Sequence, residues 1–181
     1  MLTQDYLKEC LDYNEETGEF KWKARPESHF KTKKSSKTWN TRYAYTRAGT
    51  NFRNKYVMIN FSGGMYLAHR LAWMYAHGHM PPDQIDHING NGKDNRISNI
   101  RSVTAPENSK NLARAKNNTT GVTGVSKNPK RYGKPWRARI KVNKVERTLG
   151  YFDSFEEAVK VRKQAEADLG FHPNHGRAGN G

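Results

Sequence analysis

Residues 86–108 contain the side chains whose types and spacing are best suited to chemistry. Asp86 is followed directly by His87, and two carboxamides, Asn99 and Asn108, come downstream. Carboxylate and amide oxygens are ligands that suit a hard divalent cation, and a neighbouring imidazole can act as a general base. On a chain with a formal net charge of +15, the substrate expected for this combination is a phosphodiester.

A strand, a turn and a second strand are predicted around the Asp86–His87 pair. Because adjacent residues of a strand point to opposite faces, Asp86 and His87 share one site only where a strand end or a bulge re-aims one of them. Residues 89–92 have the Asn and Gly composition of a turn. Apolar anchors for the returning strand follow at Ile97, Ile100 and Val103.

A helix is predicted directly after the returning strand. Thr104 and Glu107 have the spacing of a capping box, in which each side chain bonds the backbone N–H of the other residue. Asn108 then lies one turn inside the helix and could face back toward the carboxylate. Asn95 and the Asn and Gly residues of the turn are most simply turn formers.

This order of strand, turn, strand and helix resembles the ββα-metal unit of HNH nucleases, specifically that of phage and intron HNH homing endonucleases. The resemblance covers residues 65–112. It implies that His87 is the general base and that Asn99 orients its imidazole, a role for which Asn95 competes. It also implies two metal ligands, Asp86 and Asn108.

The implied ligand set favours a hard metal ion. Asn108 stands where many members of the family have a histidine, and with Asp86 it offers two oxygen atoms, which suit Mg²⁺ or Mn²⁺ better than zinc. We expect one divalent ion per site and no small-molecule cofactor. In the implied mechanism, neutral His87 takes a proton from a water that attacks the scissile phosphorus, while the metal stabilises the developing charge.

Two adjacent residues, His69 and Arg70, lie upstream on a helix predicted over residues 68–77. Arg70 is a candidate for binding a DNA phosphate. His69 either joins the catalytic site or is a partly buried histidine of the helix, and we favour the second interpretation.

The composition restricts the class of partner and the compartment. The chain has 32 Lys and Arg against 17 Asp and Glu and a mean hydropathy of −1.02, which favours binding to a polyanion such as nucleic acid. A single cysteine, Cys10, excludes an intrachain disulfide and a thiolate zinc cluster. There is no signal pattern and no apolar run of membrane-spanning length, so we expect a cytoplasmic protein with no membrane partner, in the bacterial host cytoplasm if a phage encodes it.

Changes in composition divide the chain into five segments. The first, residues 1–64, is loosely similar to the extension that precedes the nuclease in the homing-endonuclease group. The others are a nuclease module, a linker, a DNA-binding module and a flexible tail, at residues 65–113, 114–120, 121–170 and 171–181. Patterns in the extension predict a helix capped by Thr3, a strand, a basic mobile loop and a hairpin, at residues 2–13, 19–23, 28–43 and 56–67.

The region after the nuclease module is strongly basic. Residues 105–150 contain twelve Lys and Arg and two acids, so ten of the chain's fifteen net positive charges lie there. The alternation over residues 136–142 predicts a strand with one cationic and one apolar face. Two further strands and a helix are predicted at residues 121–126, 145–149 and 156–169.

This second module resembles the APETALA2-type DNA-binding domain at Gly124-Val125, at the Trp-x-Ala-x-Ile pattern that begins at Trp136, and at residues 149–152. In that family three antiparallel strands lie in the major groove and pack on one helix. The resemblance implies DNA contacts by Ser126, Asn128, Arg137, Arg139, Lys141 and Arg147. Family members usually have a more Arg-rich first strand than this chain, which leaves the base preference open.

Together these patterns predict an α+β protein: a ββα-metal nuclease module with a helix and hairpin extension, then a three-stranded antiparallel sheet packed on one helix. They favour a metal-dependent, site-preferring endonuclease of phage homing or mobile type that acts on double-stranded DNA. Two other classes stay open: a non-catalytic DNA-binding regulator with a decayed nuclease module, and a ribosomal-type RNA-binding protein. One active site per chain favours a monomer that nicks one strand.

Overall fold

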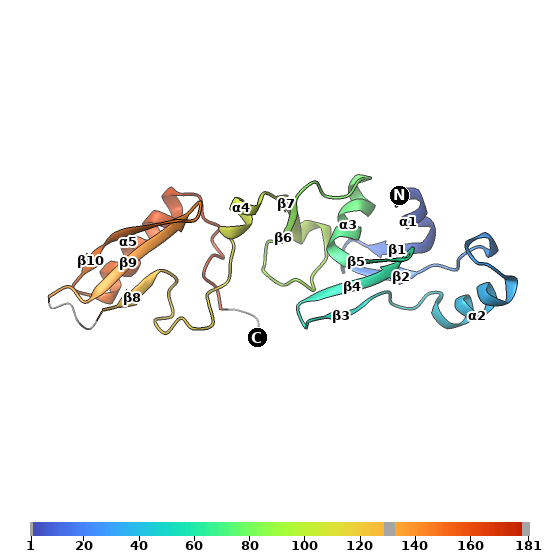
Figure 1. Cartoon of the computed structure of the whole chain (residues 1–181), viewed down its shortest axis with the longest axis horizontal. Coiled ribbons are helices and arrows are strands. Elements are labelled where there is room, and N and C mark those ends of the chain that lie inside the picture. The colour runs from blue at the N-terminus through green and yellow to red at the C-terminus, as the bar shows by residue number, and fades with distance from the viewer. Residues whose placement is uncertain (1, 129–132, 179–181) are drawn as a thin grey trace. The chain divides into compact units, whose positions relative to one another are not determined.

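The computed structural model describes residues 2–128 and 133–178. The chain divides into two compact units, Met1–Val103 and Thr104–Gly181 (Figure 1). Each unit has a hydrophobic core of its own, centred on Leu7, Ile59 and Leu71 in the first and on Val125, Ala138 and Ala158 in the second. The boundary falls inside the predicted nuclease module, between its second strand and its helix.

The first unit begins with helix α1, Gln4–Cys10, followed by a hairpin of β1, Leu11–Asn14, and β2, Glu19–Trp22. Thr3 caps α1 as predicted, because its Oγ1 accepts a hydrogen bond from the Tyr6 backbone N–H. The prediction of a helix through residue 13 is wrong at its end. Burial along β1 alternates strictly, which is the period of a strand with one buried face.

Helix α2, Lys33–Tyr43, replaces the mobile loop predicted over residues 28–43. A short 3-10 turn, Glu27–His29, precedes it, and a capping box of Thr32 and Ser35 starts it. The Trp39 ring packs edge-on against Trp22, with 5.3 Å between ring centroids. The sequence signal for this helix was weak because few apolar side chains attach α2 to the rest of the unit. Helix α2 lies at the periphery of the unit (Figure 1).

A three-stranded antiparallel sheet forms the centre of the first unit, with β4, Tyr56–Phe61, between β3, Thr50–Phe52, and β5, Gly64–Leu67. The hairpin of β4 and β5 was predicted, and its turn contains two residues with positive φ, Ser62 and Gly63. Helix α3, Ala68–His77, follows β5 directly, as predicted, and buries Leu71 and Met74. It ends at Gly78, whose φ of 83° suits glycine.

The last elements of the first unit are an antiparallel pair of strands, β6, Gln84–His87, and β7, Ile100–Val103. A short 3-10 turn, Ile97–Asn99, leads into β7. This confirms the predicted strand, turn and strand. His87 is the last residue of β6, which is the strand end that the Asp86–His87 pair requires.

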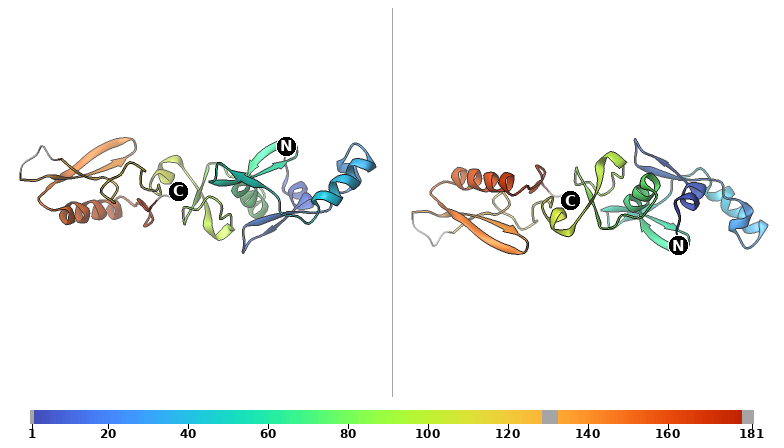
Figure 2. Two further views of the ribbon diagram at one scale, coloured as in Figure 1. Left: turned by 90° about the horizontal axis from the view of Figure 1, so that it is seen from below. Right: turned by 90° about the horizontal axis from the view of Figure 1, so that it is seen from above.

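The second unit begins with a short helix, α4, Ala105–Ser109, followed by a sheet and a longer helix. The predicted capping box of α4 is confirmed, since Glu107 Oε2 accepts from the Thr104 backbone N–H at 2.8 Å. Strands β8, β9 and β10 form an antiparallel sheet in the order β10-β9-β8, and α5 lies along one face of it (Figure 2). The bounds are Val125–Lys127 for β8, Trp136–Val142 for β9, Val145–Phe152 for β10 and Phe155–Asp168 for α5.

Residues 171–178 are hydrogen-bonded to the segment that follows α4, which differs from the flexible tail that the sequence predicted. The backbone N–H groups of His172 and Gly176 donate to the carbonyls of Lys110 and Leu112 at 3.1 and 2.9 Å. The guanidinium of Arg177 donates to the Asn111 carbonyl at 2.6 Å. Residues 179–181 of the predicted tail lie outside the described residues. No helix in the described parts of the chain is long and apolar enough to cross a membrane.

Candidate active site in the first unit and a cationic sheet in the second

Asp86 and His87 are both buried, with 6% of each residue exposed. The register of β6 and β7 places Arg101 directly opposite Asp86. The Arg101 guanidinium donates two hydrogen bonds to Asp86 Oδ2, from Nε at 3.0 Å and from Nη2 at 2.7 Å. Arg101 therefore fixes the orientation of the carboxylate. Sequence reasoning missed this residue, although the predicted hairpin register could have indicated it.

The environment of His87 favours the neutral imidazole. Burial lowers the pKa of His87, and the side chain of Asn95 together with the charges of Asp86 and Asp94 offsets this only in part. A general base must be deprotonated before it can accept a proton. His87 therefore meets this requirement at neutral pH.

The two asparagines that competed for the orienting role have different partners. Asn99 Oδ1 accepts from the Asn89 backbone N–H at 3.0 Å, and its Nδ2 donates to the Asp94 carbonyl at 2.8 Å. The Asn99 side chain thus stabilises the loop between β6 and β7 through hydrogen bonds to two of its backbone groups. The amide that interacts with the His87 ring is that of Asn95, which is 2% exposed.

The loop that carries Asn95 is held by the N-terminal hairpin. Tyr13 Oη donates to the Asn95 carbonyl at 2.6 Å. Gly18, with a φ of 72°, lies so close that a Cβ there would be 2.5 Å from the Arg96 nitrogen. Residues of the extension thereby determine where Asn95 lies next to His87.

A second imidazole, His69 of α3, packs against His87. The two ring centroids are 4.9 Å apart with an interplanar angle of 79°, and the Tyr56 ring lies 5.6 Å from His69 and 6.2 Å from His87. Burial above all lowers the pKa of His69 to about 3, with further lowering by His87 and Arg70. Its Nδ1 has no hydrogen-bond partner among the described residues. His69 is thus a buried histidine of α3, which is the interpretation that the sequence favoured, and its ring lies against that of His87.

Arg70 forms hydrogen bonds with the segment that precedes β6. Its Nη1 donates to the Asp83 carbonyl at 3.1 Å and its Nη2 to the Pro81 carbonyl at 3.2 Å. These bonds attach α3 to the segment that leads to Asp86. The predicted contact of Arg70 with a DNA phosphate stays a prediction.

The predicted metal ligands come from both units. Asp86 lies in β6, and Asn108 lies in α4 of the second unit, where its backbone N–H donates to the Thr104 carbonyl at 2.9 Å. Among the described residues there is no group of three or more His, Cys, Asp or Glu side chains that could hold a metal ion. The predicted pair of one carboxylate and one amide oxygen does not fall under that description, because it includes an asparagine. Its two oxygen ligands suit Mg²⁺, which retains several waters. The role of Asn108 stays a prediction.

Comparison with known proteins bears on the region around Asp86 and His87. Residues 66–110 match the family model described as HNH endonuclease. The chain carries an HNH endonuclease domain. Over 73 residues, or 40% of its length, the chain is also 36% identical to Protein 3.8 of Escherichia phage T7. The matched region spans 59% of that relative, and no solved structure matches the chain.

Beyond the HNH domain, the second unit has a cationic sheet face. Arg137, Arg139 and Lys141 alternate along β9 with the buried residues Ala138 and Ile140, as predicted. The register pairs Ser126 with Arg137, so these two residues share a face. Asn128 lies just after β8, and its backbone N–H donates to the Pro135 carbonyl at 2.7 Å.

Arg147 is not on the cationic face. The register places it opposite Ile140, whose side chain is in the interior on the α5 side of the sheet. Paired residues of antiparallel strands project to the same face, so Arg147 projects from the other face of the sheet than Arg137 and Arg139, and its predicted contact with DNA stays a prediction.

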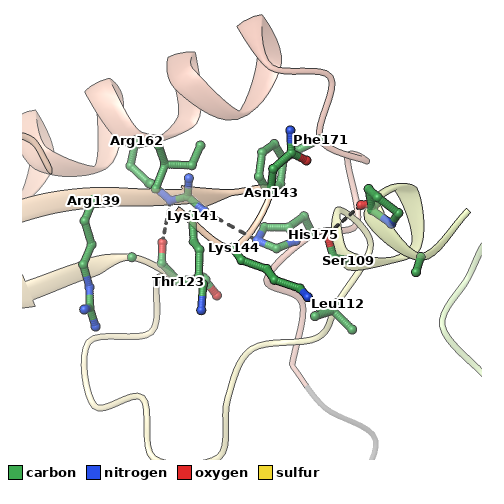
Figure 3. Close-up of a pocket in the computed structure, with 14 residues that line it drawn as sticks. Ser109, Leu112, Thr123, Arg139, Lys141, Asn143, Lys144, Arg162, Phe171 and His175 are labelled. Atoms are coloured by element: carbon green, nitrogen blue, oxygen red, sulfur yellow. Dashed lines mark hydrogen bonds between the residues drawn. The ribbon is translucent and has the colours of Figure 1, made fainter. Parts of the chain in front are cut away.

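A hollow of about 690 Å³ in the second unit lies beside a buried network centred on Arg162 of α5 (Figure 3). Arg162 is 2% exposed, and its Nε donates to the Thr123 carbonyl at 2.9 Å. Its Nη2 lies 3.1 Å from Glu166 Oε1 and 3.5 Å from His175 Nε2. This network joins α5 to the segment before β8 and to residues 171–178. Its contacts therefore stabilise the packing of the second unit.

Proposed function

We propose that this chain is a metal-dependent DNA endonuclease of phage homing or mobile type that cuts at preferred sites. The buried Asp86–His87 pair at the end of β6, inside the HNH domain, is the observation that carries the proposal. A carboxylate and a neutral imidazole next to each other are costly to bury unless they have partners, and here Arg101 and Asn95 provide them.

His87 acts as the general base. It takes a proton from a water molecule, and the water oxygen attacks the scissile phosphorus in line with the leaving 3′-oxygen. Asn95 orients the imidazole through its side chain, while Asn99 keeps the loop closed against β6. The orienting role therefore belongs to Asn95. Asn99, to which the family resemblance gives that role, supports the loop instead.

Asp86 of β6 would hold one Mg²⁺ or Mn²⁺ ion, and the family resemblance implies Asn108 as its second protein ligand. Such an ion, when bound, stabilises negative charge on the phosphate and on the leaving oxygen. Arg101 holds one oxygen of Asp86, which keeps the carboxylate in a single orientation before DNA binds. Preorganisation of this kind reduces the entropy that binding costs.

The second unit is proposed to bind double-stranded DNA through the exposed face of β8 and β9. Its candidates are Ser126, Asn128, Arg137, Arg139 and Lys141, and the implied arrangement is that of an APETALA2-type domain. A second binding module increases the effective concentration of the nuclease at a DNA site without any new contact in the catalytic site. A monomer with one active site then cuts one strand, in the cytoplasm of a bacterial host.

Plasmid nicking in the presence of Mg²⁺ tests this function. We expect the parent to convert supercoiled plasmid to open circles, and His87→Ala to be slower by about 10²–10⁴-fold, the range for loss of a general base. His79→Ala is the matched control, because His79 is an exposed histidine that lies outside both α3 and β6. Equal cleavage by the parent and His87→Ala would remove His87 as the base. Tight DNA binding by a parent that cuts with neither Mg²⁺ nor Mn²⁺ would favour the non-catalytic regulator.

A further inference from the structure

The cationic face of the second unit contains one carboxylate, Glu146 of β10. Its Oε1 accepts from Arg137 Nη2 at 3.2 Å, and its Oε2 accepts from Arg139 Nη1 at 2.8 Å. Thr148 Oγ1 accepts a further hydrogen bond from Arg137 Nη2 at 2.6 Å. One acid therefore bridges the two arginines that are proposed to contact DNA.

The strand register explains this arrangement. Glu146 is paired with Lys141 and Thr148 with Arg139, so all four side chains project from the same face as Arg137. The side chains of Glu146, Arg137 and Arg139 are 41%, 30% and 45% exposed. Ion pairs between side chains as exposed as these contribute little to folding stability. Stability alone is therefore a weak reason for an acid at this position.

Glu146 affects DNA binding in two opposite ways. Its negative charge repels phosphate and neutralises part of the charge of two arginines, which weakens sequence-independent binding. It also fixes the guanidinium planes of Arg137 and Arg139. A fixed guanidinium is better prepared to bond the O6 and N7 atoms of guanine with two parallel hydrogen bonds.

We propose that Glu146 is a specificity-determining residue: it holds Arg137 and Arg139 in position for base edges and limits their binding to the phosphate backbone. This inference rests on the proposed DNA-binding role of the second unit. It applies to discrimination between DNA sequences, and it leaves the chemistry at His87 unchanged.

Two binding measurements on the full chain test the proposal, both with a chelator present so that the DNA stays intact. The first follows the affinity for random-sequence duplex DNA against salt concentration. We expect Glu146→Gln to bind several-fold more tightly than the parent, with a log–log salt slope steeper by about 1, because one additional phosphate contact forms. The second selects bound sequences from a randomised DNA pool, and we expect Glu146→Gln to enrich fewer fixed base positions.

Glu156→Gln is the matched control. It makes the same change in net charge in the same unit, on α5, which packs on the other face of the sheet. If Glu146→Gln and Glu156→Gln have the same salt slope and enrich the same sequences, Glu146 is only a cross-strand ion pair and the proposal is overturned. Thermal unfolding of both variants verifies that the second unit stays folded.

A double variant separates this proposal from the one on which it rests. Arg137→Gln with Arg139→Gln is expected to lose affinity for DNA and to flatten the salt slope. If the double variant binds DNA as the parent does, the DNA-binding role of the sheet is wrong. If it loses binding while Glu146→Gln matches its control, the role of the sheet stands and that of Glu146 alone fails.

Discussion

Among single residues of the HNH domain, His69 has a pKa that burial lowers strongly. Its pKa of about 3 means that the folded protein keeps His69 neutral where an unfolded chain would protonate it. A depressed histidine pKa therefore stabilises the fold fully above the unfolded pKa near 6.5, and this stability is lost as the pH falls from 6.5 toward 3. Each pH unit within that window costs about 1.4 kcal/mol.

The consequence is a specific acid sensitivity. We expect the parent to lose about 2 kcal/mol of unfolding free energy from His69 alone between pH 6.5 and pH 5. His69→Phe keeps a ring in the cluster with Tyr56 and His87 and removes the titrating group, so its loss over the same interval should be smaller by that amount. Urea unfolding at both pH values measures the difference. His79→Ala should behave like the parent, and an identical loss in His69→Phe and the parent would contradict the assignment.

The different partners of Asn95 and Asn99 lead to different expected phenotypes. Asn95→Ala removes an interaction that raises the pKa of His87, so that pKa should fall further and the acid limb of the cleavage rate should move to lower pH. Turnover should also fall, because the imidazole is less well oriented. Asn99→Ala leaves two backbone groups of the loop without their side-chain partner, at a cost of about 1–3 kcal/mol of stability.

Cleavage rates between pH 5 and 8 and urea unfolding of both variants distinguish these roles. A shifted pH profile in Asn99→Ala and an unshifted one in Asn95→Ala would reverse the assignment. The sequence could not decide between the two asparagines, because each is compatible with a turn and with a catalytic amide. Only the course of the loop between β6 and β7 places Asn95 next to the ring.

At the level of elements, α5 is anchored by a buried ion pair. Replacing Arg162 by Met removes the buried one of two cations beside Glu166 and leaves the ion pair of Lys163 Nζ with Glu166 Oε2 at 2.8 Å, so we expect the second unit to lose about 1–3 kcal/mol of stability. Adding Glu166→Leu should recover part of that loss, because two apolar side chains then replace two charges. Denaturant unfolding of the single and double variants measures the effect. A double variant that is less stable than Arg162→Met would contradict this role of the Arg162–Glu166 ion pair.

Elements with strong local signals were predictable from the sequence. Helix α3, the hairpin of β4 and β5, and strands β6, β7 and β9 have clear periodicity or turn residues, and the structure confirms each of them. Helix α2 was not predicted, because a capping box and one anchored tryptophan attach a segment that otherwise has the composition of a loop. The start of β1 was missed because its apolar residues fit a helical and a strand period equally well.

The Asp86–His87 pair of the candidate site was also recognisable in the sequence, but the residues packed around it were not. Asp86 and His87 are adjacent in a recognisable pattern, whereas Arg101, Tyr13 and His69 reach the site through strand register and tertiary packing. Similarly, alternation along β9 identified the cationic face, and only the pairing with β10 places Glu146 on it and Arg147 on the other side. Contacts between elements hold the information that the local pattern lacks.

The whole chain combines an HNH domain with a basic second unit in one polypeptide. Each of the two parts is expected to bind DNA weakly alone. Together they are expected to bind DNA more tightly and at preferred sequences. The claim on which everything else depends is narrower: the His87 imidazole removes the proton from the attacking water. Neither DNA affinity nor stability measures that step.

Chemical rescue tests that claim most directly. His87→Gly removes the ring and leaves space for an added base, so imidazole in solution should restore single-strand cleavage of a labelled duplex with Mg²⁺ present. The same addition should not rescue Asp86→Ala, which retains His87. We expect the cleavage rate to rise with the concentration of neutral imidazole in His87→Gly and not in Asp86→Ala. Cleavage by His87→Gly at the parental rate without imidazole would contradict it.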